Sequence, residues 1–352
     1  MTRYILTAVL FAGIFTIGIV FLEPSRAQTR DQKLSVPDQQ DPEMALTIKR
    51  LTDRSTQGLA ERKLSDGTIE LDLEERFQNV PLARIDQAGD ADVGCVTSLA
   101  EANDFFGRDL ETGQIYPSMP EATDHAQSET GPHEMSVDEY EFYKKLIENA
   151  TAQRLAYPET ATLTIVNGDG IAEGFNDLST RTPEGGNDGT TLGEQRLKLF
   201  NFAAGIWGAY LDSTVQTQIF SKFDPLTPCS TSGGVLGSAG ATSIYRNFPG
   251  AEFSNTWYSY ALANKIRGSD SNILTNEINA TFNSDIDNGC LGTGTRFYYG
   301  LNNSTPSGMV NLLVVLLHEM GHGLGFQTYA NGSTGALNGG FPDVYTRHMF
   351  DR

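Results

Sequence analysis

The stretch that most constrains this chain is H-E-M-G-H at residues 318–322, close to the C-terminus. The apolar run of residues 312–317 leads directly into it, and the two together predict a buried helix. Residues four apart lie one above the other on a helix, so His318 and His322 direct two imidazoles at one place. Two neutral imidazoles on a rigid element are the usual beginning of a zinc site. Glu319 lies one step around the helix, where its carboxylate can act as a general base on a water at that metal.

The context of the motif supports a helix of sufficient length. Thr305 and Pro306 suit a helix cap and first turn, and Gly323 and Gly325 follow the second histidine as stop signals. The bare H-E-x-x-H pattern arises by chance in about one chain in a hundred of this length. These flanking signals favour a zinc hydrolase over a coincidental match on a buried helix.

The stretch H-E-M-G-H-G-L-G-F, residues 318–326, resembles the active-site helix of metzincin-type zinc proteases, whose pattern is H-E-x-x-H-x-x-G-x-x-H/D. Gly325 falls on the family glycine, but the third-ligand position is Thr328, which is not a credible zinc ligand. The H-x-L-G-F ending is similar to leishmanolysin-like proteases, whose third histidine follows a long insertion. Three other segments resemble a group of bacterial secreted predicted metalloproteases: residues 191–197, 235–240 and 298–301.

This resemblance covers about residues 160–352 and implies an α+β (mixed α/β) fold with a zincin-like catalytic domain. A twisted sheet would lie over the H-E-x-x-H helix, and its edge strand would border a cleft in which peptides bind by strand addition. The implied function is that of a secreted zinc-dependent endopeptidase. His318 and His322 would hold the zinc ion, and Glu319 would take a proton from the activated water.

Three segments of the chain differ in composition. Residues 1–27 have the features of a secretory signal, with Arg3 before a 19-residue apolar run and small residues at a cleavage site, residues 25–27. An uncleaved membrane anchor is the alternative, because such a run nearly spans a bilayer. Residues 28–155 are polar and rich in turn-formers, and resemble a propeptide or accessory segment; a loosely folded linker is the other interpretation. Residues 156–352 form the expected catalytic domain.

The composition limits the partners. A formal net charge of −19 argues against nucleic acid, which requires basic patches. Acidity of this size favours solubility and identifies no substrate. The family resemblance implies a bacterial protein that acts on proteins or peptides, and residues 1–27 predict export, with membrane contact only if they are retained.

Local patterns predict the elements of the catalytic segment. Strands are expected at residues 162–166, 215–220, 278–282 and 296–299, and helices at residues 191–211 and 257–267. Thr191 and Glu194 form a capping box for the first of these helices. Its expected core stripe is Leu197, Phe200, Ala204, Trp207 and Leu211.

Two features were expected outside that framework. A helix with Val137, Tyr140, Tyr143 and Ile147 on one face would follow a capping box of Ser136 and Glu139. The Gly/Asp/Asn-rich residues 168–189 could hold Ca²⁺, although an irregular surface loop is the simpler interpretation because the EF-hand spacing is missing.

The three cysteines are assigned different roles. Cys229 and Cys290 lie in Gly/Ser/Thr-rich loops, and in an exported protein we expect them to form a disulfide. Cys95 lies in the presumed propeptide, and propeptides of several metzincins silence the enzyme with a thiolate on zinc. Cys95 could act in this way, or it could be a buried thiol without a function. His125 and His133 are most simply surface residues.

The third zinc ligand is the gap in this interpretation. His348 is the sole histidine after the motif, so it either folds back to complete the site or the ligand is encoded beyond Arg352. We expect the second, that is, a catalytic domain incomplete at its C-terminus. Two other functions stay open: an exported surface or adhesion module that keeps the fold without cleaving anything, and zinc hydrolysis of a non-peptide substrate.

Overall fold

The computed structural model describes part of the chain. The described residues are 40–86, 88–115, 137–152, 160–226, 229–231, 233–332 and 334–348. The expected signal at residues 1–27 lies outside them, as do His125, His133 and the proposed cap Ser136. The chain from Val36 onwards forms one unit, and only that unit is considered below.

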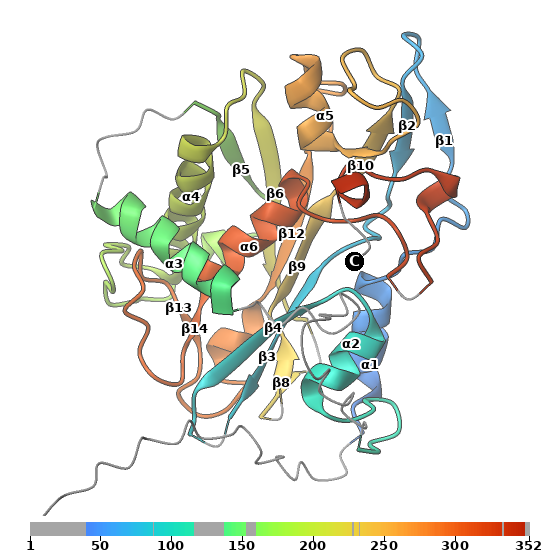
Figure 1. Cartoon of the computed structure of the whole chain (residues 1–352). Helices are drawn as coiled ribbons and strands as arrows, with labels where there is room; N and C mark the ends of the chain where they lie inside the picture. The colour runs from blue at the N-terminus through green and yellow to red at the C-terminus, as the bar shows by residue number, and fades with distance from the viewer. Residues whose placement is uncertain are drawn as a thin grey trace, which may run out of the picture. The chain divides into compact units, whose positions relative to one another are not determined.

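The protein is a mixed α/β structure, as expected (Figure 1). Its helices within the described residues are α1 (Pro42–Leu51), α2 (Leu99–Phe106), α3 (Val137–Ala152), α4 (Leu192–Tyr210), α5 (Tyr260–Arg267) and α6 (Leu312–Leu324). One sheet has the order β1 (Glu61–Lys63), β2 (Ile69–Asp72), β10 (Ser243–Arg246), β11 (Tyr258–Ser259). A second has the order β5 (Leu163–Asn167), β6 (Thr217–Asp224), β12 (Ile278–Asn283), β9 (Gly237–Ala241). A third has the order β4 (Ala91–Val96), β3 (Val80–Ile85), β8 (Gly233–Val235), β7 (Cys229–Ser230), and β13 (Phe297–Tyr298) pairs with β14 (Val310–Asn311).

The second sheet is the platform on which α6 lies. Its strands β5, β6 and β12 are parallel, and β9 runs antiparallel to β12 at one end. Alternate residues of β6 are buried, including Ile219 and Phe223, as the period-two pattern predicted. Helices α4 and α6 pack on the same face of this sheet, and α3 packs against both (Figure 1). The strands expected at residues 162–166, 215–220 and 278–282 are confirmed, with ends shifted by at most four residues.

Helix α6 begins later than the sequence suggested. Its cap is Asn311, whose side-chain oxygen accepts the backbone N–H groups of Leu313 and Val314. The expected cap at Thr305-Pro306 is therefore wrong: Thr305 instead accepts a hydrogen bond from the Asn311 amide, at 2.8 Å. The helix ends at Gly325, whose φ of 124° a residue with a side chain rarely adopts. Its N-terminal half is wholly buried, which explains why the apolar run has no polar face.

Helix α4 confirms the predicted capping box and corrects the predicted stripe. The Thr191 hydroxyl accepts the Glu194 N–H, and the Glu194 carboxylate accepts the Thr191 N–H. Phe200, Ala204 and Trp207 are buried as expected, but Leu197 is 37% exposed. The stripe was misplaced because α4 contacts the sheet on one side and α6 on another, so its buried arc is wider than one helical row.

Residues 41–115 contain far more structure than the sequence suggested. They form α1, four strands and α2, so the interpretation as a loosely folded linker is wrong. Strand β2 pairs antiparallel with β10, and β3 pairs antiparallel with β8. Helices α1 and α2 pack on the β3–β8 sheet through a hydrophobic cluster that contains Met44, Phe105 and Val235. The segment therefore shares sheets and core with the region expected to be catalytic.

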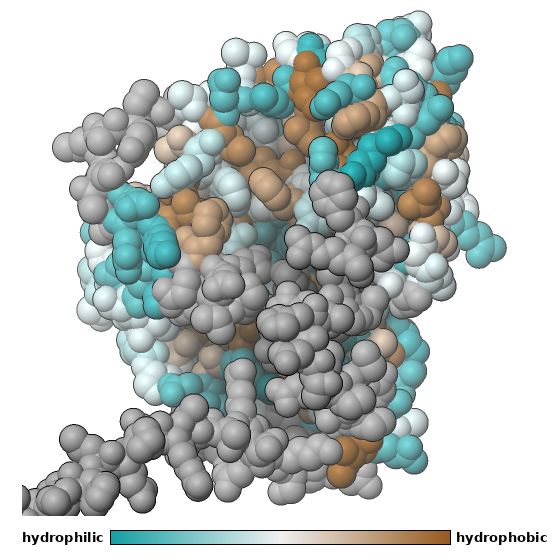
Figure 2. All heavy atoms as spheres, viewed as in Figure 1, coloured by the Kyte–Doolittle hydropathy of each residue, from teal (hydrophilic) through white to brown (hydrophobic). Residues whose placement is uncertain are grey.

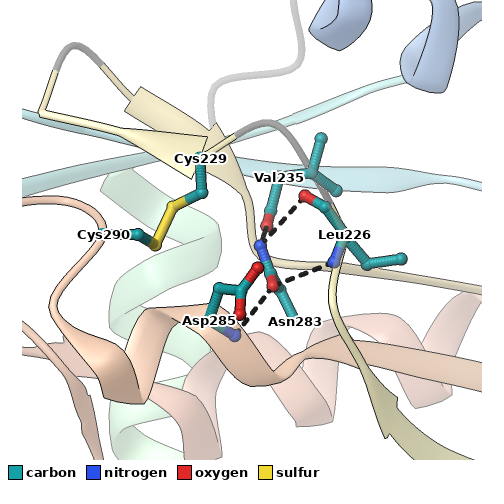
Figure 3. Close-up of a disulfide and its surroundings, with 6 residues drawn as sticks. All are labelled: Leu226, Cys229, Val235, Asn283, Asp285 and Cys290. Atoms are coloured by element: carbon teal, nitrogen blue, oxygen red, sulfur yellow. Dashed lines mark hydrogen bonds between the residues drawn. A yellow bond between two sulfur atoms is a disulfide. The ribbon is translucent and has the colours of Figure 1, made fainter.

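The predicted disulfide between Cys229 and Cys290 is present (Figure 3). It joins β7 to the loop after β12 across 61 residues, and closing a loop of that length stabilises the fold by about 4 kcal/mol in the chain-entropy account. Asn283 lies beside it and donates to the carbonyls of Leu226 and Val235, at 3.2 and 2.8 Å (Figure 3). These bonds hold the end of β12 to β8.

The surface view shows no continuous hydrophobic area on the coloured part of its face. Brown residues form separate small patches among hydrophilic ones (Figure 2). Over the residues that the structure describes, no helix has the length and hydropathy needed to cross a membrane.

The contact between α6 and β12 leads to a first prediction. A methyl group added at Gly323 would lie 2.5 Å from a methyl of the buried Ile278. Alanine favours helix by up to about 1 kcal/mol, but overpacking a rigid core costs about 1–3 kcal/mol. We expect Gly323→Ala to lower the melting temperature. Gly332→Ala is the control, since no atom lies within 4 Å of its added carbon, and equal melting temperatures for the two variants would contradict this packing.

Candidate metal centre

Helix α6 directs its two histidines at one point, as the four-residue spacing requires. The Nε2 atoms of His318 and His322 lie 2.8 Å apart, with the two rings nearly perpendicular. His318 is 2% exposed and packs edge-on against Tyr143 of α3, whereas His322 is half-buried. In tetrahedral zinc sites, Zn–N bonds of about 2.0–2.1 Å separate two nitrogens by about 3.4 Å. An ion at this point would therefore part the two nitrogens by about half an ångström.

A backbone carbonyl fixes the tautomer of His322. Its Nδ1 lies 2.8 Å from the carbonyl oxygen of Phe326, and because that oxygen only accepts, Nδ1 carries the proton. In the tautomer with the proton on Nδ1, the lone pair of Nε2 is directed towards His318. Metal-bound histidines almost always donate their other N–H in this manner. Phe326 is held by stacking on Trp207, whose indole N–H donates to the Leu317 carbonyl of α6 at 3.1 Å.

The thiol of Cys95 completes the group of side chains. Its sulfur lies 3.8 Å from Nε2 of His322 and 3.9 Å from Oε1 of Glu319. Bond lengths of about 2.3 Å to sulfur and 2.0–2.1 Å to nitrogen would place S and N about 3.6 Å apart around a tetrahedral ion. Among the described residues, Cys95, His318, Glu319 and His322 are the one cluster of three or more metal-ligand side chains, with donor atoms within 4.8 Å of one another. This buried group could hold a metal ion.

Strand β4 delivers Cys95 to this place. Cys95 lies opposite Pro81 of β3 in the antiparallel register, and β3 continues the pairing to β8. The residues just before β3 reach β9, where Asn79 and Ala239 exchange two backbone hydrogen bonds of 3.2 and 3.3 Å. Because β9 packs against α6, these strand pairings place the Cys95 thiol of the N-terminal segment beside the histidines of α6. The outer edge of β9 is thus already paired, and the expected open edge beside a cleft is not present here.

The surroundings of the cluster are almost dry. Cys95 is 4% exposed and Glu319 is fully buried, so charges here are not screened by bulk water. Nearby, burial lowers the pKa of Arg54, while the charge of Glu101 opposes that shift. Burial in turn raises the pKa of Glu101, against hydrogen bonds from Thr97 and the charge of Arg54. The Glu319 carboxylate lies in the same low-dielectric region, where a buried negative charge is costly unless a cation accompanies it.

Other residues proposed from the sequence lie elsewhere. The hydroxyl of Thr328 donates to Asp343, at 2.9 Å, and takes no part in the cluster. His348 is exposed and its ring lies against Phe253, so it does not fold back to the histidines.

The candidate calcium loop, residues 168–189, uses its carboxylates within the protein. Asp169 accepts the backbone N–H groups of Phe175 and Phe223, at 2.7 and 2.8 Å. Glu184 pairs with Arg296, at 2.6 Å. In the described part of the chain, this loop contributes nothing to a cluster of metal-ligand side chains.

Several supporting residues escaped the sequence interpretation. We expected Trp207 to be a core residue and Phe326 to be the end of the motif. Nothing in the neighbouring sequence indicates that these two residues position His322. The β2 strand was detectable, because Ile69, Leu71 and Leu73 alternate with polar residues. The contact of Cys95 with the helix was open to expectation only through the resemblance to metzincin propeptides, because no local pattern joins residues separated by 224 positions.

Comparison with protein-family models, with curated proteins and with solved structures finds no match to this chain.

The geometry predicts which side chains bind metal. We expect Zn²⁺ titration to give one tight site that is weakened at least about a hundredfold by His322→Ala or Cys95→Ser, because each removes one of three donors. The protein loaded with Co²⁺ should show a thiolate-to-metal charge-transfer absorption that Cys95→Ser abolishes. His348→Ala is the control and should leave both measurements unchanged. Loss of the site in that variant instead would show that His348 is a ligand.

Proposed function

We propose that this protein is a zinc-dependent endopeptidase in which His318 and His322 bind the metal and Glu319 is the general base. The observation that carries the proposal is the convergence of two imidazoles and a carboxylate from one turn of a buried helix. The fixed tautomer of His322 supports it further, because the ring offers its lone pair to the cluster. The resemblance of residues 318–326 to the metzincin helix supports peptides as the substrate class.

The proposed mechanism gives each side chain a distinct task. A bound zinc ion would supply Lewis-acid polarisation of the scissile carbonyl and would lower the pKa of a water towards about 7. Glu319 accepts the proton of that water and passes it to the leaving amine. Its burial keeps the carboxylate unsolvated, so it exchanges protons with the reacting groups rather than with bulk water. His322 is kept in one orientation by the Phe326 carbonyl throughout.

The position of Cys95 suggests that the chain, as folded here, is a latent form. A thiolate on the metal would occupy the place that the attacking water needs. The edge of β9, along which a peptide could pair, is also occupied by Asn79. Export is part of the proposal, and the Cys229–Cys290 disulfide is compatible with an oxidising compartment.

The alternative function is an exported binding module that holds zinc without catalysis. The observation that favours it is burial, since Cys95, His318 and Glu319 are each less than 5% exposed. A site closed by four protein groups is typical of structural zinc. The two functions differ in whether the protein hydrolyses peptides and, if it does, whether hydrolysis requires Glu319.

A substitution at Glu319 tests the enzyme. Glu319→Gln should retain zinc and fold while lowering peptide hydrolysis at least about a hundredfold, because a general base of this kind contributes that much. The measurement is the rate of cleavage of an unstructured protein such as casein, with zinc content and circular dichroism as controls. Hydrolysis at the original rate in the folded, zinc-loaded variant would remove Glu319 from the mechanism. Absence of hydrolysis in both the original protein and Cys95→Ser would favour the binding module.

Latency predicts the opposite effect at Cys95. At saturating zinc, Cys95→Ser should cleave the same substrate at least about tenfold faster per zinc-loaded molecule, because the competing thiolate is gone. Expressing the rate per bound zinc separates this effect from the weaker binding of the variant. A Cys95→Ser protein no faster than the original would mean that the thiol does not silence the site. The double variant Cys95→Ser/Glu319→Gln should be inactive.

A further inference from the structure

We infer that Asn79 and Gln327 position the metal-binding histidine His322 from a distance, so the N-terminal segment tunes the metal centre as well as supplying a thiol to it. This inference rests on the proposed metal site and concerns how the site is held. It starts from the turn that follows α6, residues 326–329, because the carbonyl of Phe326 in that turn fixes the tautomer of His322.

The turn is clamped on two sides. On one side the ring of Phe326 stacks on Trp207, 6.1 Å between centroids, and Trp207 is anchored to α6. On the other side the N-terminal segment contacts the turn three times. The amide of Asn79 donates to Oε1 of Gln327, at 2.5 Å, and Arg54 donates to the carbonyl of Thr328, at 2.7 Å.

The third contact is between aromatic rings. Phe77 packs edge-on against Tyr329, with centroids 6.0 Å apart. The side-chain amide of Gln327 donates from Nε2 to the hydroxyl of Tyr329, at 2.8 Å. Gln327 is therefore held at both ends of its amide, and its side chain has one available orientation.

Asn79 is the most informative of these residues. It is 2% exposed, and Gln327 is 5% exposed, so their hydrogen bond is shielded from water. The backbone of Asn79 is fixed by two hydrogen bonds with the backbone of Ala239 in β9. Two residues later, Pro81 lies opposite Cys95. One strand thus holds both the Cys95 thiol and the turn whose Phe326 carbonyl orients His322, and loosening that strand disturbs both.

The expected consequence is a change in metal affinity without loss of any ligand. Removing one partner of a buried hydrogen bond leaves the other unsatisfied, and the turn moves to find a new partner. Groups that orient ligands typically account for 10–100-fold in metal affinity. Asn79→Ala and Gln327→Ala should each weaken Zn²⁺ binding about tenfold, and the double variant should be little worse than either single one, because the two act as one contact.

The experiment needs a control that loses a buried amide elsewhere. Asn187 is 1% exposed and donates to the carbonyls of Gln195 and Tyr299, at 2.9 Å each, far along the chain from the cluster. Asn187→Ala should lower the melting temperature but leave zinc affinity unchanged. If it weakens zinc as much as Asn79→Ala does, the effect is general destabilisation and the inference is wrong.

A second readout does not depend on metal or on hydrolysis. In the metal-free protein at pH 8, the imidazole nitrogen resonances of His322 should report a protonated Nδ1, and Asn79→Ala should shift them towards a mixture of tautomers. Unchanged resonances together with unchanged zinc affinity would overturn the inference. Should Asn79→Ala fail to fold, Asn79→Ser keeps a polar group too short to reach Gln327 and serves instead. Because neither readout uses peptide cleavage, the result stands apart from that of Glu319→Gln.

Discussion

The antiparallel pairing of two extended stretches, residues 69–85 and 233–246, is the interaction on which the rest of the structure depends. It joins β2 to β10, Asn79 to Ala239 and β3 to β8, and so connects three sheets. The pairing is interrupted at Glu74, Glu75 and Phe77, which all have positive φ, so the strand bends and changes register there. Beyond the bend it runs along β9, next to α6, and its partner β4 brings a thiol to the histidines. Without this pairing the two halves of the metal cluster would have no contact.

The cluster itself is an electrostatic arrangement that burial makes consequential. A thiol, a carboxylate and two imidazoles lie together where at most a few per cent of three of them reaches solvent. Unscreened negative groups of this kind are costly unless a positive charge accompanies them, and a divalent cation between them would offset that cost. The same burial limits access for a substrate, which is consistent with the proposed latency. In that proposal, catalysis requires a water at the place that the Cys95 thiol would occupy.

Packing around α6 gives the site its rigidity. Gly323 allows the helix to approach Ile278 closely, the Asn311 cap fixes its start, and Trp207 connects its body to the turn beyond Gly325. The N-terminal segment holds the far side of that turn through Asn79 and Arg54. Each of these contacts acts on the orientation of the His322 ring. A motif therefore indicates which side chains could bind a metal, while their orientation depends on residues outside the motif.

The local features of this protein follow from short stretches of its sequence. The spacing of His318 and His322 placed two imidazoles on one helical face, the Thr191–Glu194 box started α4, and the alternation of Ile278, Ala280 and Phe282 defined β12, because each signal acts within a few residues. Patterns of that range could not identify Asn311 rather than Thr305 as the cap of α6. The pairing of β14 with β13 keeps the chain extended up to Asn311, so the helix begins after that residue. They could not place Cys95 either, and its role at the metal was raised only through the resemblance to metzincin propeptides. The tertiary structure alone decided that the thiol joins the histidines, that His348 does not, and that Asn79 reaches Gln327, because contacts across more than 200 residues depend on strand pairing and core packing, not on neighbouring residues.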